Sequence, residues 1–133
     1  MRKMDIPREL NWVKERYACT VEIVFNQLCD GIREDVELIN SSPNAKDPYH
    51  FQANMHSSGT TIIVGRPNAI PRRRLRVGVV ENRIVVEQEW DNMTWNAVIG
   101  LNDEGRCVLR LEDGTQLEQW QFRRRALESL FFE

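Results

Sequence analysis

Hydrophobic and charged residues alternate in two consecutive runs near the middle of the chain, Arg73–Val80 and Arg83–Trp90. Alternation with a period of two is typical of β-strands that bury one face. A tight turn that pairs Val80 with Arg83 joins the two runs into a predicted β-hairpin. In this register the apolar side chains share one face and the charged side chains share the other. A slip by one residue would destroy both faces, so the sequence specifies this register strongly.

The predicted hairpin has an apolar face with one polar exception. The apolar members are Leu75, Val77, Val79, Ile84, Val86 and Trp90. On the opposite face Arg76 lies across from Glu87 and Arg74 from Glu89, which predicts a ladder of ion pairs. Gln88 is the exception, because the register places its amide on the apolar face. A buried amide without a partner costs about 1–3 kcal/mol, so Gln88 is either a bonded structural residue or part of a pocket.

Apolar residues recur at intervals of three and four from Leu10 to Ile39, a spacing that predicts an amphipathic helix. An unbroken helix from Ile6 to Ile39 would span about 50 Å, more than a domain of this size normally needs. Two interpretations remain open. The helix bends at Gly31, or its ends project from the domain and meet a partner.

Two more hairpins extend the predicted sheet. Residues 51–55 and 60–64 alternate around a Ser58–Gly59 turn, which pairs Met55 with Ile62 and Ala53 with Val64. After the central hairpin, pairing Trp90 with Trp95 would place Val86 opposite Ile99 and Ile84 opposite Leu101. A last strand then adds Cys107, Leu109 and Leu111 to the apolar face.

The C-terminal segment carries two competing signals. Thr115–Glu118 has the spacing of a helix capping box, and the apolar residues that follow predict a helix: Leu117, Trp120, Leu127, Leu130 and Phe131. Asp113–Gly114 is also a hairpin signal, so a seventh strand through Phe122 is the alternative. We favour the helix. The resulting fold is a single α+β domain over residues 1–133, with a long N-terminal helix and a C-terminal helix packed on one face of a roughly six-stranded antiparallel meander.

Composition adds few constraints. The chain has 133 residues, 29% of them charged, and a net charge of −2, so no global field favours nucleic acid or an anionic membrane. No apolar run reaches the length of a membrane span or resembles a signal peptide. Cys19, Cys29 and Cys107 are an odd, unclustered set, and Cys19 and Cys29 on one helix would lie about 15 Å apart. We therefore expect free thiols, an inert core position for Cys107 and a cytoplasmic location.

Candidate chemistry is sparse. The arginines between Arg66 and Arg76 lack interleaved aromatic residues and face glutamates, so an ion-pair ladder is favoured over a nucleic-acid patch. The basic run Arg123–Arg125 is diluted by acids and fits a docked core helix better than a membrane-surface helix. His50 and His56 lack neighbouring ligands at metal spacing, and Ser57–Ser58 has no activating base in sequence. We expect no metal, no cofactor and no enzymatic activity.

Two function classes remain. The first is a non-catalytic protein-interaction module that forms a homodimer through the N-terminal helix, with Leu10, Val13 and Tyr17 at the interface, or through a sheet edge. The second is a carrier or sensor of a small molecule or lipid. Its pocket would lie between helix and sheet near Gln88 and would be lined by a set of four residues: Gln88, Trp90, Trp95 and Ala97.

Overall fold

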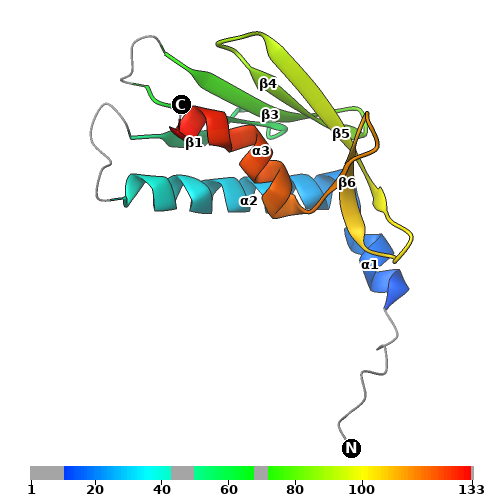
Figure 1. Ribbon diagram of the computed structural model, residues 1–133. Helices are drawn as coiled ribbons and strands as arrows, with labels where there is room; N and C mark the ends of the chain where they lie inside the picture. Colours follow the sequence, from blue (N-terminus) through cyan, green and yellow to red (C-terminus); the bar gives the residue numbers. More distant parts are fainter. Residues whose placement is uncertain (1–10, 43–49, 68–71, 133) are drawn as a thin grey trace, which may run out of the picture.

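The structure is a computed structural model that describes residues 11–42, 50–67 and 72–132. Within these residues the elements are α1 (Trp12–Ala18), α2 (Val21–Asn40), β1 (Gln52–Met55), β2 (Thr61–Gly65), β3 (Arg74–Val80), β4 (Arg83–Gln88), β5 (Met93–Leu101), β6 (Cys107–Leu111), β7 (Gln116–Leu117) and α3 (Gln119–Phe132). The described strands form one seven-stranded antiparallel sheet in sequential order, and α2 and α3 cover one of its faces (Figure 1). The predicted α+β class is confirmed, with one strand more than expected.

The central hairpin has the predicted register. Val80 pairs with Arg83 and Val77 with Val86. On the face that meets the helices, Leu75, Val77, Ile84 and Val86 are fully buried and form the middle of the core. The first hairpin is also as predicted, because Met55 pairs with Ile62 in β1 and β2.

The predicted register of β5 is wrong. Trp95 pairs with Val86 rather than Trp90, and Ala97 rather than Leu101 pairs with Ile84. The connection begins directly after Gln88, and Asn92 adopts a positive φ of 58° within it. The slip covers an even number of residues, so every side chain keeps its predicted face and the apolar pattern is satisfied equally well.

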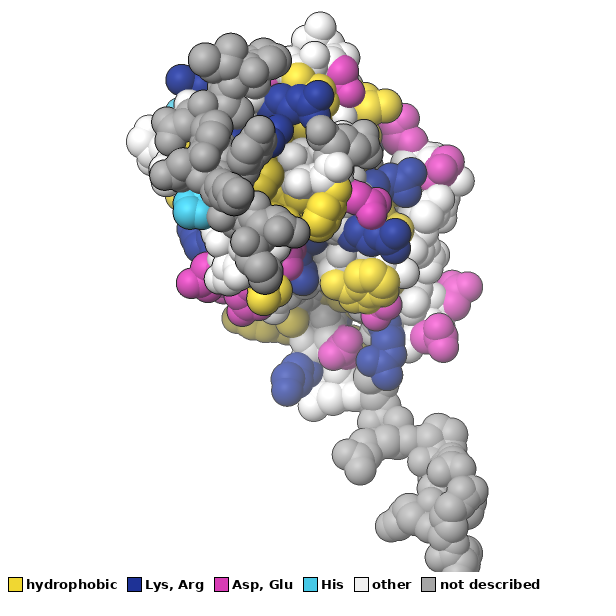
Figure 2. Space-filling model, turned by 60° about the vertical axis from the view of Figure 1, so that its left-hand side comes forward, with side chains coloured by type: hydrophobic (Ala, Val, Ile, Leu, Met, Phe, Trp, Pro, Cys, Tyr) yellow, Lys and Arg dark blue, Asp and Glu magenta, His cyan; other side chains and the backbone are white. Residues whose placement is uncertain are grey.

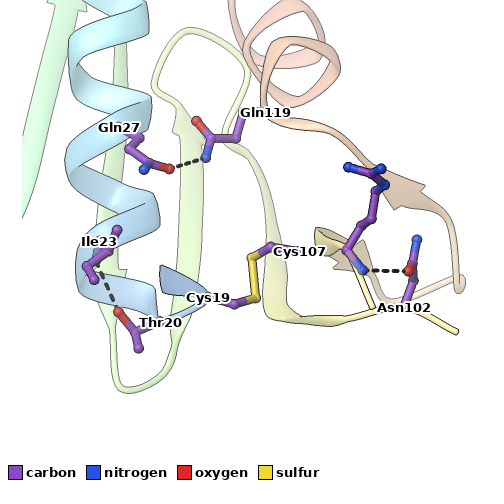
Figure 3. Close-up of a disulfide and its surroundings, with 8 residues drawn as sticks. Cys19, Thr20, Ile23, Gln27, Asn102, Cys107 and Gln119 are labelled. Atoms are coloured by element: carbon purple, nitrogen blue, oxygen red, sulfur yellow. Dashed lines mark hydrogen bonds between the residues drawn. A yellow bond between two sulfur atoms is a disulfide. The ribbon is translucent and has the colours of Figure 1, made fainter. Parts of the chain in front are cut away.

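The N-terminal helical stripe is interrupted between Cys19 and Val21, so the unbroken helix is wrong. Thr20 is extended (φ −121°, ψ 155°), and its hydroxyl accepts a hydrogen bond from the backbone N–H of Ile23 at 3.3 Å (Figure 3). This is an N-cap, which starts a new helix in place of continuing the old one. The predicted stripe is buried along α2, whereas α1 buries no residue; Ile6 and Leu10 lie outside the described residues.

Gly31 does not bend the helix but allows α3 to approach it. It lies inside α2, and a Cβ there would stand 2.6 Å from Nη1 of Arg123 and 2.7 Å from its Cζ. Arg123 in turn donates from Nε to the carboxylate of Asp35 at 2.8 Å. The missing side chain therefore makes room for an ion pair between the two helices.

Cys19 and Cys107 form a disulfide, with 5.5 Å between their Cα atoms (Figure 3). The expectation of free thiols is therefore wrong for these two residues, and Cys107 is not an inert core thiol. The bond ties the junction of α1 and α2 to the start of β6. Closing a loop of 88 residues restricts the unfolded chain, which stabilises the fold by roughly 4–5 kcal/mol in the chain-entropy view.

The C-terminal segment combines both predicted alternatives. Asp113–Gly114 forms a turn, with Gly114 at a φ of 90°, and β7 pairs with β6 before α3 begins at Gln119. The predicted capping box at Thr115 is wrong. Instead, the side-chain oxygen of Gln121 accepts a hydrogen bond from the backbone N–H of Glu118 at 2.9 Å. Phe122 is fully buried on this helix, whereas Trp120, expected on the apolar face, is exposed.

We expect a thiol-reactive dye to detect no accessible cysteine in the folded, oxidised protein. Cys29 is buried, and burial raises the pKa of its thiol to about 11, so little reactive thiolate forms at neutral pH. Denaturation without reductant should reveal one thiol, and denaturation with reductant should reveal three. Three thiols in the denatured, unreduced sample would contradict the disulfide.

Gly31→Ala should fail to stabilise the protein, although alanine in a helix is ordinarily favoured by about 1 kcal/mol over glycine. The new Cβ would displace Arg123 from Asp35. In an Arg123→Ala background the obstruction is gone, and the same substitution should stabilise by about 1 kcal/mol. Urea unfolding of the wild type, the two single variants and the double variant measures the effect of Gly31→Ala on stability with and without Arg123. An equal gain in both backgrounds would show that Arg123 does not restrict this position.

Candidate functional site

Two regions of the described structure stand out, and the first is the surface of α1. Its apolar side chains Trp12, Val13 and Tyr17 are 68%, 58% and 77% exposed. A hollow of about 530 Å³ opens between these residues and the start of α2. The predicted interface residues Val13 and Tyr17 therefore lie on an uncovered surface, whereas Leu10 is outside the described residues.

The charged residues around this surface carry both signs. Lys14 and Arg16 lie on α1 beside Glu15, and Glu22 follows in the first turn of α2. Asn11 caps α1, its side-chain oxygen accepting a hydrogen bond from the backbone N–H of Lys14 at 3.1 Å. The surface thus combines an apolar centre with alternating charges, a composition suited to a protein contact.

The second region is a pocket of about 420 Å³ at the end of the sheet, between β4, β5, the turn after β6 and α3. Gln88 lines it and is 7% exposed, as the central hairpin register predicts. Trp95 also lines the pocket, and its ring packs against Phe122 with 5.0 Å between centroids. The guanidinium carbon of Arg125 lies 5.9 Å from the centre of the Trp95 ring.

The other two predicted pocket residues are elsewhere. Ala97 is buried opposite Ile84, because the true β5 register moves it away from Gln88, where Met93 stands instead. Trp90 lies in the turn after β4 beneath the guanidinium of Arg73, at 5.6 Å. The structure therefore brings together Gln88 and Trp95 from the predicted set and does not include Trp90 and Ala97.

Sequence reasoning missed the other seven residues that line the pocket: Met93, Thr94, Asn96, Leu111, Glu112, Asp113 and Arg125. Asp113 accepts a hydrogen bond from the backbone N–H of Thr115 at 2.9 Å. The side-chain and backbone hydrogen bonds from Thr115, together with the charge of Arg125, hold the pKa of this carboxyl below its ordinary value. The sequence Asp113-Gly114-Thr115 predicts the turn. The residues around Arg125 do not predict that α3 places this side chain at the pocket.

The arginines on the central strands are engaged with acids and rings. Arg74 and Arg76 both donate from Nε to Glu89, at 2.9 and 2.7 Å. The predicted Arg76–Glu87 ion pair is therefore wrong, although the two residues are directly opposite in the sheet. Burial alone would raise the pKa of Glu89, but the hydrogen bonds from Arg76 and Arg74 outweigh it and hold this pKa below its ordinary value.

Aromatic rings do accompany two other arginines, contrary to expectation. The guanidinium of Arg66 lies 5.3 Å from the ring centre of Phe51, just as Arg73 lies over Trp90. Each of these two rings thus makes a cation–π contact with an arginine of its own chain. On the face shown in Figure 2, side chains of both charge signs stand among apolar ones, so this face presents no single-sign field.

The basic C-terminal helix is docked. Phe122, Ala126, Leu127 and Leu130 of α3 are buried against the core, as the docked-helix interpretation predicts. Among the described helices, none combines the length and apolar character required to cross a bilayer.

His56 and Ser58, in and beside the β1–β2 turn, are linked by hydrogen bonds. His56 Nδ1 accepts a hydrogen bond from the backbone N–H of Ser58 at 3.1 Å and lies 3.2 Å from its hydroxyl. The hydroxyl also accepts from the backbone N–H of Thr60 at 3.3 Å. This arrangement closes an exposed turn, and the lone pair of Nδ1 is occupied. Across residues 11–42, 50–67 and 72–132, His, Cys, Asp and Glu form no group capable of holding a metal ion.

Comparisons of this chain with protein-family models, with curated proteins and with solved structures found no match.

We predict that Glu89→Gln lowers the free energy of unfolding by about 1 kcal/mol at neutral pH, since it weakens two charge-assisted hydrogen bonds. Glu87→Gln is the matched control and should change little. Because the folded pKa of Glu89 is depressed, the stabilisation is complete above the ordinary glutamate pKa of about 4.3 and is lost as pH falls through the folded value. The gap between wild type and Glu89→Gln should therefore close in acid. A gap that persists there would show that charge is not the cause.

Proposed function

We propose that the protein is a non-catalytic interaction module that pairs with a second copy of itself through α1. The observation that supports this proposal is the exposure of Trp12, Val13 and Tyr17 on a helix that buries no residue in the chain itself. Large apolar side chains gathered on one surface element are typical of contact sites. Covering them would remove apolar area from water at roughly 25 cal/mol per Å².

The length of α1 supports the same proposal. An isolated helix of seven residues is far below the length at which helices are stable in water. α1 has an N-cap at Asn11 and a disulfide just after its end, but it lacks apolar packing against the core. Packing against another surface would supply the stabilisation that this chain does not.

A second copy is the occupant that the charges favour. A two-fold axis brings the same surface of both copies together, so each charge needs an opposite charge nearby on that surface. Glu15 and Arg16 are adjacent on α1, and Glu22 of α2 lines the same hollow as Arg16. Antiparallel packing of two α1 helices could thus place acids of one copy against bases of the other.

The sheet edges are less suited to pairing. The described edge strands β1 and β7 have four and two residues, and short edges offer few unpaired backbone groups to another strand. We therefore prefer α1 to the sheet-edge alternative.

The disulfide bears on where such a module would act. The cytoplasmic expectation depended on unpaired cysteines, and the Cys19–Cys107 bond removes that support. Structural disulfides persist mainly in oxidising compartments. We propose such a compartment in place of the cytoplasm.

Light scattering tests the pairing. At high micromolar concentration the wild type should have twice the 15.6 kDa mass of one chain. Val13→Glu combined with Tyr17→Glu should give the single-chain mass with an unchanged circular dichroism spectrum, because two buried charges would oppose contact. Leu38→Glu is the control, since Leu38 is 72% exposed on α2, and its mass should equal that of the wild type. A monomeric wild type would overturn the proposal.

A further inference from the structure

Gln88 is 7% exposed, and its side-chain amide makes no hydrogen bond within the residues that the structure describes. The amide nitrogen and oxygen are not fully enclosed, so they can be reached from the pocket at the end of the sheet. Its neighbours across the sheet are Leu75 and Met93, and neither side chain offers a good partner. An amide closed off from water without a partner costs about 1–3 kcal/mol, so the Gln88 amide is expected to bond water or a ligand in the pocket. Gln88 lines this pocket, so its amide N–H and C=O are available to hydrogen-bond water or a ligand that occupies the pocket.

Three of the nine residues that line the pocket are apolar, and one of these three is aromatic. Trp95, Met93 and Leu111 line it beside Gln88, and its volume of about 420 Å³ lies in the range of small-molecule sites. The ring of Trp95 packs against that of Phe122, with 5.0 Å between centroids and 56° between planes. An indole beside an amide without a partner among the described residues is an arrangement that suits a flat ligand.

The pocket is lined by one cationic and two acidic side chains. Arg125 from α3 and Asp113 from the turn after β6 both line it, and Glu112 adds a carboxylate that accepts a hydrogen bond from Asn96 at 3.1 Å. Asp113 is held by Thr115, and Arg125 lies over Trp95. The one negative charge in excess disfavours an anionic ligand, and the guanidinium of Arg125 offsets part of the attraction for a cation.

We propose that this pocket binds a neutral, planar heterocycle that carries a hydrogen-bond donor beside an acceptor on one edge, as a nucleobase does. The amide of Gln88 presents its N–H and its C=O side by side and can bond both groups of such an edge. Trp95 supplies an aromatic ring against which the heterocycle can pack, beside the guanidinium of Arg125 that lies 5.9 Å from the indole centre. The site is distinct from α1 and does not depend on the proposed homodimer.

Binding of adenine and uracil, each tested alone, provides the experiment. We expect each base to raise the melting temperature and to change the tryptophan fluorescence, with saturation at millimolar concentration or below. Indole, which is flat and has a donor but no acceptor, should bind at least tenfold more weakly. Trp95→Phe should remove the fluorescence change, and Trp120→Phe should retain it, because Trp120 is exposed on α3 and does not line this pocket.

Gln88→Leu separates recognition from stability. It should weaken binding of both bases at least tenfold while leaving the melting temperature of the free protein equal or higher. Gln88→Met, with an unbranched side chain of similar length, should behave in the same way and covers the case in which leucine does not fit. A lower melting temperature for both variants would show that the amide has a structural partner. The proposal would be overturned by that result, by a wild type that responds to neither base, or by indole binding as tightly as the bases. None of these outcomes affects the light-scattering mass, which tests pairing through α1.

Discussion

The pairing register between β3 and β4 is the constraint on which the rest of the structure depends. It places Leu75, Val77, Ile84 and Val86 together under α2 and α3, where all four are fully buried. A slip by one residue would turn arginines and glutamates toward the helices, and burying unpaired charges is far more costly than any strand contact can offset. On the opposite face the same register brings Arg74 and Arg76 within reach of Glu89. The helices then have one apolar surface on which to pack, and their own buried stripes match it.

Predictions from sequence succeeded where a pattern had a single solution. The central hairpin has one register that sorts apolar from charged residues, and it was predicted residue by residue, as was the α2 stripe. The register of β5 had several solutions, because every even slip keeps Trp95, Ala97 and Ile99 on the apolar face. The choice among them is made by the turn after Gln88, where Asn92 adopts a positive φ. Asparagine favours this conformation, but its presence does not determine how many residues the turn contains. The break in the N-terminal helix was similarly hidden, since the spacing of three and four continues through Thr20 while its hydroxyl caps a new helix.

The residues of the candidate pocket also differ in how far the sequence could predict them. Gln88 could be placed on the apolar face from sequence because its position depends on the β3–β4 register alone. Arg125 and Asp113 could not, since they reach the pocket through the packing of α3 and the turn after β6, which join distant parts of the chain. The disulfide is a comparable case. Its two cysteines are 88 residues apart, and their approach depends on how α2 and β6 sit in the finished fold.

The strand β6 links the two candidate sites while keeping them separate. Cys107 at its start is bonded to Cys19, which holds the end of α1, and Leu111 at its end lines the pocket beside Gln88. Between them Leu109 is buried in the core and pairs with Ile99 and Leu117, so the strand is held on both sides. Displacing the centre of β6 would disrupt the packing of the sheet. A small displacement at one end of the strand is therefore not expected to reach the other end. Contact at α1 and occupation of the pocket are therefore expected to be energetically independent, which is why a change in mass and a change in melting temperature can be interpreted separately.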